Sequence, residues 1–197
     1  MIAVIDSGVA NLASVLAALS RLGRRGEVTT DAKLIGKADY IILPGVGAAA
    51  AAMEQLRRHD LVDALRAARQ PLLGICLGMQ LLFARSQESG GVDCLRIIPG
   101  TIKALSAAPS LPVPHMGWNR IHHRESGQPL LHGIDDGSFL YFAHSFAASG
   151  ADHAMAFTEY GERFAAIVSY ENFFGCQFHP ERSGTPGLRL IENFLRI

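Results

Sequence analysis

The sequence has few cysteines, and neither charge is in excess. Its 197 residues include only Cys76, Cys94 and Cys176, and no two of these form a C-x-x-C pair. This sparse set argues against a disulfide framework and against a zinc site. Because unpaired cysteines are typical of reducing compartments, we expect a cytoplasmic protein. The 18 basic and 18 acidic side chains cancel, so no basic surplus indicates a nucleic-acid partner.

Long apolar runs and nucleotide-binding motifs are also missing. No hydrophobic stretch approaches the roughly 20 residues that span a bilayer, so we expect no membrane segment. The chain opens directly on the apolar run Ile2–Ile5, without the basic segment that begins a secretion signal. It contains neither G-x-G-x-x-G nor a phosphate-loop lysine. We therefore expect neither a metal nor an organic cofactor.

The pattern of apolar residues predicts the fold class. Residues 1–197 are about half apolar, which suits one domain with a sizeable core. The first half alternates apolar runs such as Tyr40–Leu43 with helix-like stretches such as Ala48–Arg58. This alternation predicts an α/β fold with a doubly wound, mixed but mostly parallel sheet and helices on both faces. The second half carries short β-rich pieces and then a helix, at Thr101–Leu105, Trp118–His122, Phe139–Phe146, Phe164–Phe178 and Leu188–Ile197.

The pentapeptide Gly74–Gly78 is the most informative segment. It places Cys76 between two glycines, after the apolar run Pro71–Leu73 and before the helix-like stretch Met79–Arg85. A nucleophile on a sharp turn between a strand and a helix is typical of a nucleophile elbow. At that position the helix dipole favours a reactive thiolate. The alternative interpretation is a buried structural cysteine, since free cysteines are among the most buried residues.

The segment Gly175–Glu181 contains the other groups that a thiol nucleophile requires. Pro180 disfavours a helical conformation at His179, and in an extended chain side chains two residues apart share a face. Glu181 can therefore orient the imidazole, as the carboxylate of a catalytic triad does. Taken alone, this segment can equally be a polar turn. The other histidines are alternative bases: His59, His115, His122, His123, His132, His144 and His153.

The segment Pro44–Gly47 follows the predicted strand Tyr40–Leu43. Ligands of doubly wound sheets bind beyond the carboxyl ends of the strands, and the elbow is expected at the same edge. This segment can therefore supply a second oxyanion donor. Glycines on both sides of Val46 allow its peptide group to turn at little steric cost. An ordinary strand-to-helix turn is the alternative.

Together these segments resemble the class I glutamine amidotransferases. Gly74–Gln80 is similar to the nucleophile motif of that family, and Gln177–Glu181 is similar to its histidine–glutamate motif. A narrower resemblance, to the glutaminase subunits of imidazole glycerol phosphate synthases, spans nearly the whole chain. Its most discriminating segment is Val113–Asn119. Further matches are Asp6–Asn11, Leu43–Ala48 and Tyr141–Phe146.

The resemblance implies a role for each of these residues. Cys76 would attack the side-chain amide of glutamine and form a glutamyl thioester, His179 would transfer the protons, and Glu181 would orient His179. The resemblance also implies that the N–H groups of Val46 and Leu77 form an oxyanion hole. It further implies that Gly47, Gln80 and Ser145 bind the substrate.

The resemblance further implies a partner. Ammonia would pass to a separate (β/α)8-barrel synthase subunit that makes imidazole glycerol phosphate and AICAR in histidine biosynthesis. Trp118 and Tyr141 are then expected near the partner face, and a place in the core is the alternative for both. The oxyanion segment is expected to be mis-set until the partner is loaded. Ser7 and Ala10 depart from the usual Tyr and Gly of the family, which affects contacts of the first loop.

Other functions stay open from the sequence. A glutaminase of vitamin B6, purine or anthranilate synthesis would share the catalytic motifs, and a thiol peptidase or esterase could share the fold. A regulatory binding protein with an inactive site is a third alternative. The complete Cys–His–Glu set argues against that last interpretation.

Overall fold

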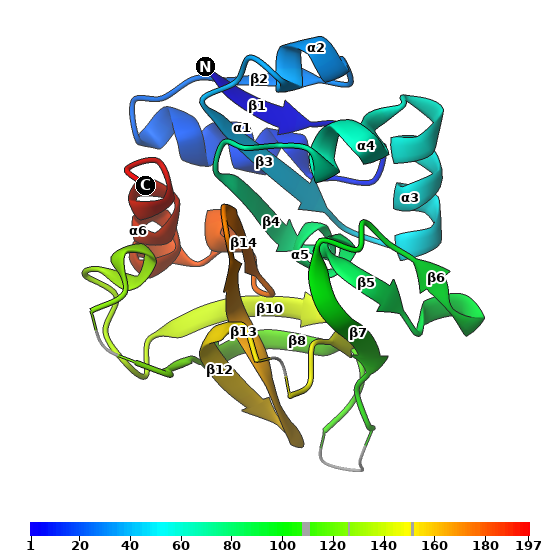
Figure 1. Ribbon diagram of the computed structural model, residues 1–197. Helices are drawn as coiled ribbons and strands as arrows, with labels where there is room; N and C mark the ends of the chain where they lie inside the picture. Colours follow the sequence, from blue (N-terminus) through cyan, green and yellow to red (C-terminus); the bar gives the residue numbers. More distant parts are fainter. Residues whose placement is uncertain (108–110, 126, 151) are drawn as a thin grey trace.

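The computed structural model describes residues 1–107, 111–125, 127–150 and 152–197, and its largest feature is an eight-stranded sheet (Figure 1). The strand order is β2-β1-β3-β4-β14-β13-β12-β9. From β2 to β14 neighbouring strands are parallel, and the remaining pairs are antiparallel. The strands are β1 Ile2–Ile5, β2 Gly26–Thr29, β3 Tyr40–Gly45, β4 Leu72–Cys76, β9 His122–His123, β12 Ala154–Tyr160, β13 Glu162–Tyr170 and β14 Phe173–Cys176.

Helices cover both faces of this sheet (Figure 1). Alternate strand residues point to opposite sides, so Val4 and Ile42 belong to one buried cluster, whereas Ala3 and Ile41 belong to the other. The first cluster also contains α1 and α6, and the second contains α3, α4 and α5. The helices are α1 Leu12–Arg21, α2 Ala32–Ile35, α3 Ala49–Arg58, α4 Leu61–Arg66, α5 Leu77–Leu82 and α6 Gly184–Phe194. The predicted α/β class is thus confirmed.

Two smaller sheets complete the fold. A two-stranded antiparallel sheet joins β8 to β10, and a four-stranded sheet has the order β11-β7-β5-β6. Three single-turn 3₁₀ helices cover Glu88–Gly90, Pro129–Leu131 and Pro180–Arg182. The strands are β5 Phe83–Ser86, β6 Val92–Asp93, β7 Ile98–Ala104, β8 His115–Arg120, β10 Phe139–His144 and β11 Phe146–Ala147. Within the described ranges, no helix combines the length and apolar character needed to cross a membrane.

The helix predicted over Met79–Arg85 is wrong at its end. The chain turns helical already at Leu77, stops at Leu82 and continues directly as β5. The carbonyl groups of Leu81, Leu82 and Phe83 accept hydrogen bonds from the backbone N–H groups of residues 95, 97 and 96. These carbonyls are therefore satisfied by a distant segment, and the helix ends where that segment captures them.

Other boundaries also differ from the sequence prediction. The carboxyl-terminal helix spans Gly184–Phe194 instead of starting at Leu188 and reaching the last residue. The β-rich piece Phe164–Phe178 is two strands separated by a turn at Glu171, whose φ is +53°. Strands β2 and β12 carry no clear apolar pattern, because β2 leaves two of its four residues exposed and β12 buries small or polar side chains at Ala154, Ala156 and Thr158.

Glycine is required where α5 packs against β3. A Cβ atom added to Gly78 would lie 1.7 Å from the carbonyl oxygen of Leu43, and one added to Gly74 would lie 2.6 Å from the backbone nitrogen of Met79. Both neighbours are backbone atoms of regular elements, so neither can give way cheaply. The two glycines that flank Cys76 are therefore imposed by packing.

We expect Gly78→Ala to destabilise the fold by about 3 kcal/mol or more, because the new methyl group overlaps a fixed carbonyl. Urea unfolding followed by circular dichroism measures the loss. Gly36→Ala is the matched control, because its Cβ would lie at an ordinary 3.5 Å from the nearest atom. Equal stabilities of the two variants would contradict the steric argument.

Candidate active site

The strand β4 delivers Cys76 to the carboxyl edge of the main sheet. Its last residue is Cys76, and α5 begins at the next residue. The backbone of Cys76 has φ +52° and ψ −108°, a left-handed conformation that costs energy for a residue with a side chain. Such strain is typical of a nucleophile elbow, in which the turn lifts the side chain out of the sheet. The register of the sheet places Gly45 opposite Cys76.

His179 and Glu181 lie together beside this turn. The Nδ1–H group of His179 donates to Oε1 of Glu181 at 2.9 Å, and both side chains are buried. The backbone N–H of His179 donates to the carbonyl of Tyr141 at 2.9 Å. The imidazole is therefore anchored by its own backbone to β10, and its Nδ1 is committed to the carboxylate. Nε2 remains for Cys76.

The electrostatic environment of His179 favours the imidazolium. Burial by itself lowers the pKa of the imidazole, but the hydrogen bond to Cys76, the hydrogen bond to Glu181 and the charges of both partners raise it to about 10. Since this value lies above the 6.5 of an unperturbed histidine, the interaction stabilises the fold fully below about pH 6.5. The contribution is lost as the pH rises through the folded-state value.

The other candidate nucleophiles and bases have a different environment. Burial raises the pKa of the Cys94 thiol to about 11 and that of Cys176 well above its usual value. Both side chains are buried, so they pack as small apolar residues. Burial lowers the pKa of His115 to about 4 and is the main cause that lowers that of His144 to about 3. These two histidines are therefore neutral.

The predicted oxyanion donors differ in how they are placed. Leu77 is the first residue of α5, where backbone N–H groups have no acceptor within the helix. The N–H of Val46 donates instead to the carbonyl of Val9 at 2.6 Å, while the side chain of Val46 is 39% exposed. Ser7 is buried, and its hydroxyl donates to the carbonyl of Pro44 at 3.3 Å. The first loop thus holds the oxyanion segment in its present orientation.

A cavity of about 310 Å³ opens next to the elbow. Its lining includes the three catalytic candidates, both oxyanion candidates and all three substrate-binding candidates: Cys76, His179, Glu181, Val46, Leu77, Gly47, Gln80 and Ser145. Gln80 is held by its side-chain NH₂ group, which donates to the carbonyl of Phe146 at 2.7 Å. The volume lies at the lower end of the range of small-molecule sites.

Comparisons with known proteins identify the family. The model of the family "Glutamine amidotransferase class-I" matches residues 3–197. The chain belongs to the class I glutamine amidotransferases. It is 48% identical to "Imidazole glycerol phosphate synthase subunit HisH" of Salmonella typhimurium over 196 residues, which are 100% of this chain and 99% of that protein. It is 46% identical to the subunit of the same name from Yersinia pseudotuberculosis, with the same coverage.

The fold of this amidotransferase also agrees with a solved structure of the family. The structure of PurLQS from Thermotoga maritima superposes with a TM-score of 0.72 at 18% identity, covering 99% of this chain and 97% of that one. At such low identity the likeness shows the fold alone. It confirms the predicted α/β arrangement with an elbow.

Two further residues beside the catalytic candidates carry no role predicted from the sequence. Glu88 lines the cavity, and its Oε2 accepts from the backbone N–H of Ala49 at 2.7 Å. Gln177 is fully buried and places its side-chain nitrogen 3.7 Å from the sulfur of Cys76. No local pattern marks Glu88, since it lies in a turn far from the motifs. Gln177 stands inside the histidine–glutamate motif, and that position was the only available signal.

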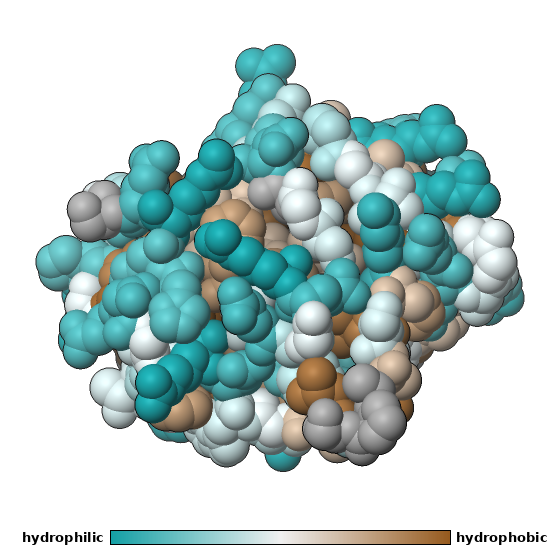
Figure 2. Space-filling model, turned by 90° about the horizontal axis from the view of Figure 1, so that it is seen from below, coloured by the Kyte–Doolittle hydropathy of each residue, from teal (hydrophilic) through white to brown (hydrophobic). Residues whose placement is uncertain are grey.

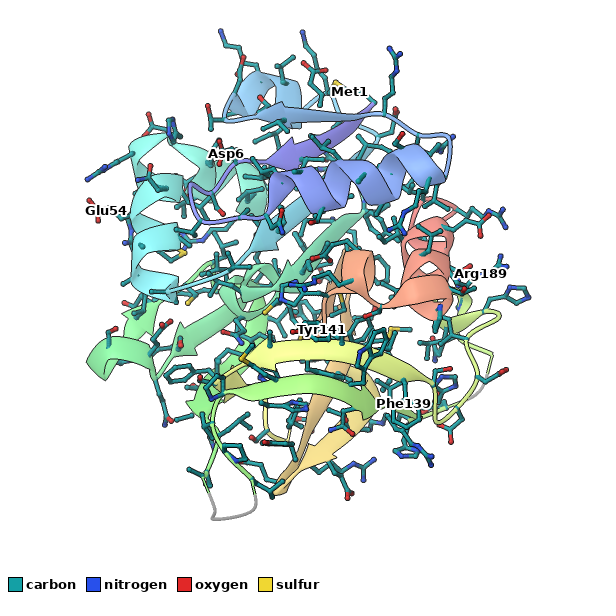
Figure 3. All side chains as sticks on the ribbon, turned by 180° about the vertical axis from the view of Figure 1, so that it is seen from behind. Met1, Asp6, Glu54, Phe139, Tyr141 and Arg189 are labelled. Carbon is teal, nitrogen blue, oxygen red and sulfur yellow. The ribbon has the colours of Figure 1, made fainter. Side chains whose placement is uncertain are left out.

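Trp118 and Tyr141 form one aromatic pair at the surface, in which Trp118 is exposed and Tyr141 is partly buried, and neither side chain belongs to the buried core. They face each other across the β8–β10 ladder with ring centroids 6.0 Å apart, and Trp118 is 55% exposed. Met116 and Phe139 are also exposed on these strands. Seen from behind, the two strands lie in front of the molecule, with Tyr141 and Phe139 on β10 (Figure 3). We call these four residues the aromatic face.

The surface at the β12 end of the molecule differs from the aromatic face. Viewed from below, hydrophilic residues cover most of that end, and its hydrophobic areas are small and separated (Figure 2). Among the described residues, no group of three or more His, Cys, Asp or Glu side chains is arranged to hold a metal ion. Within the part of the chain that the structure describes, the candidate active site is therefore the cavity that Cys76, His179 and Glu181 line.

We expect Glu181→Gln to lower the pKa of His179 by about one unit or more, because the variant removes the negative charge beside the imidazolium. An NMR titration of the imidazole measures the value directly. Glu54→Gln, on the exposed side of α3, is the control and should leave the titration unchanged. A variant that titrates like the parent protein would contradict the role of the carboxylate.

Proposed function

We propose that this protein hydrolyses glutamine to glutamate and ammonia and delivers the ammonia to the synthase that makes imidazole glycerol phosphate and AICAR in histidine biosynthesis. The observation that carries the proposal is the placement of Cys76 on a strained elbow, in one cavity with the His179–Glu181 pair. The names of its relatives, which are subunits of imidazole glycerol phosphate synthase, support the pathway.

The reaction begins with the thiolate of Cys76 and the imidazolium of His179. The sulfur attacks the side-chain carbonyl carbon of glutamine, so a C–S bond forms and the carbonyl oxygen takes up the negative charge. His179 then donates its proton to the amide nitrogen, the C–N bond breaks, and ammonia leaves. Water attacks the resulting thioester while His179 accepts its proton. The C–S bond then breaks and glutamate leaves, so the thiolate of Cys76 and the imidazolium of His179 are restored. Glu181 stabilises each imidazolium state.

The oxyanion requires two donors. We assign them to the N–H groups of Leu77 and Val46, each of which is expected to contribute about 3 kcal/mol to the transition state. The Val46 N–H now donates to Val9, so it must turn before it can serve. Gly47 follows with φ +81°, a conformation in which glycine carries no steric penalty. We propose that loading of the partner drives this turn and thereby activates the site.

The cavity also supplies groups for the amino-acid end of the substrate. We assign substrate binding to Gly47, Gln80 and Ser145, which all line it. Glu88 adds a carboxylate to the same wall, and Glu181 is already committed to His179. A negative side chain at that position suits the α-ammonium group of glutamine. This assignment extends the set that the sequence resemblance implied.

The aromatic face suits a protein partner. Exposed Trp, Tyr, Phe and Met side chains are enriched at the centres of protein interfaces. The carbonyl group of Tyr141 itself accepts the hydrogen bond from the backbone N–H of His179. This face is therefore adjacent to the catalytic site. We propose that a separate (β/α)8-barrel synthase subunit docks here and receives the ammonia. The free cysteines agree with assembly in the cytoplasm.

We expect Cys76→Ala to abolish glutamine-dependent synthesis by the complex and to retain synthesis from added ammonium. The thiol is needed only to release ammonia, so the synthase step remains intact. Product formation is measured with each nitrogen source. Cys94→Ala, which removes a buried thiol outside the cavity, should retain both activities. Loss of both activities in the Cys76 variant would argue against transfer between two sites, and peptide cleavage without glutamine turnover would favour a thiol peptidase.

We expect Trp118→Ala to weaken binding of the synthase subunit by at least about tenfold, because truncation of a central aromatic at an interface typically costs about 2 kcal/mol. Titration calorimetry with the purified subunit measures the affinity. Val28→Ala, an exposed apolar residue on β2, is the matched control. An unchanged affinity of the Trp118 variant would place the partner on another surface.

A further inference from the structure

A buried chain of hydrogen bonds leads away from the sulfur of Cys76, and the triad does not use it. The side-chain nitrogen of Gln177 lies 3.7 Å from this sulfur. The side-chain oxygen of Gln177 accepts from the NH₂ group of Gln80 at 3.1 Å, and that NH₂ group also donates to the carbonyl of Phe146 at 2.7 Å. Gln177 is fully buried, so these contacts replace solvent for its amide.

The carbonyl of Phe146 fixes the orientation of both amides. A carbonyl oxygen only accepts hydrogen bonds, so Gln80 must turn its NH₂ group toward Phe146. The same NH₂ group faces Gln177, which must therefore turn its oxygen toward Gln80. The NH₂ group of Gln177 is then left facing Cys76. The opposite orientation would bring two oxygen atoms together at Phe146 without a proton between them.

A second branch from the same carbonyl holds it in place. Nδ1 of His144 lies 2.8 Å from the oxygen of Phe146, so this nitrogen carries the proton. Nε2 of His144 then accepts from Nδ1–H of His115 at 3.0 Å, and Nε2 of His115 accepts from the side-chain amide of Asn119 at 3.3 Å. Asn119 also donates to the carbonyl of Glu159 at 2.8 Å. Every proton along this branch has a defined place.

The surroundings of the two histidines agree with this arrangement. His115 stacks between the rings of Tyr160 and Phe142, at centroid distances of 4.1 and 4.9 Å, and Phe164 packs on both imidazoles. The charge of His179 also lowers the pKa of His144. In the neutral state each imidazole has one donor and one acceptor, which is what the branch requires.

We propose that Gln177 is a catalytic residue, whose side-chain N–H donates to the sulfur of Cys76 and stabilises the attacking thiolate. A charged acceptor forms a stronger hydrogen bond than a neutral one, so a donor of fixed orientation favours the thiolate over the thiol. The role in turnover rests on the proposed function, because glutamine is the molecule attacked. The effect on the sulfur itself needs neither glutamine nor the partner.

The direct test is Gln177→Met, which keeps the length of the side chain and removes the donor. We expect the pH midpoint for alkylation of Cys76 by iodoacetamide to rise by about one unit, which corresponds to the loss of one hydrogen bond to a charged group. For the same reason kcat/KM for glutamine in the complex should fall about tenfold at neutral pH. The alkylation is read by mass spectrometry on the peptide that contains Cys76, so the other thiols do not contribute.

The matched control is Gln70→Met, the same substitution at a partly buried glutamine outside the cavity, whose side-chain NH₂ group donates to the carbonyl of Ile35 at 2.6 Å. It should leave the midpoint unchanged. A midpoint of Gln177→Met equal to that of the parent protein would overturn the proposal. A shift of the same size in both variants would also overturn it, because that result would indicate a general loosening of the fold.

A second measurement covers the case in which Gln177→Met does not fold. In the parent protein, the side-chain amide proton of Gln177 should show an NMR shift that follows the titration of Cys76 and is flat in Cys76→Ala. An amide signal that ignores Cys76 in the parent protein would overturn the proposal. Both measurements use the chain alone. An absence of glutaminase activity in the complex would therefore refute the proposed function, but it would not change what these two measurements say about Gln177 and Cys76.

Discussion

The packing of the β4–α5 turn against β3 is the constraint on which the rest of the site depends. Gly78 lies so close to the carbonyl of Leu43 that no side chain fits between them. Because the helix can approach this far, Cys76 is forced into its left-handed conformation at the carboxyl edge of the sheet. The same approach sets Gly45 opposite Cys76, so the oxyanion segment and the nucleophile share one cavity.

Burial has opposite consequences for the histidines near this cavity. It lowers the pKa of His115 and His144 because neither has a carboxylate partner, and both serve as neutral links. His179 is buried as well, but Glu181 and Cys76 more than offset the loss of solvation. The protein therefore separates one imidazole whose charged form is favoured, His179, from two neutral imidazoles, His115 and His144. Charged partners decide the difference, not exposure.

The strand β10 connects the chemistry to the surface. One face of the β8–β10 sheet carries the pair of the exposed Trp118 and the partly buried Tyr141, and the other buries His115 and His144. The carbonyl of Tyr141 accepts the backbone hydrogen bond of His179. This alternation follows from the two-residue period of a strand. Any partner seated on the aromatic face therefore contacts a strand that also positions His179.

Local signals in the sequence were enough for some elements of the site. The buried strand before Cys76 and its glycine flanks are specified by neighbouring residues, so they could be predicted. His179 is extended as predicted, but Pro180–Arg182 form a 3₁₀ turn, so this turn and not an extended segment brings Glu181 beside the imidazole. Tertiary contacts set where α5 ends, the hydrogen bond from Val46 to Val9, the place of Glu88 at the cavity and the contact of Gln177 with Cys76. These features depend on hydrogen bonds between segments far apart in the chain. No local pattern encodes such partners, because folding alone brings them together.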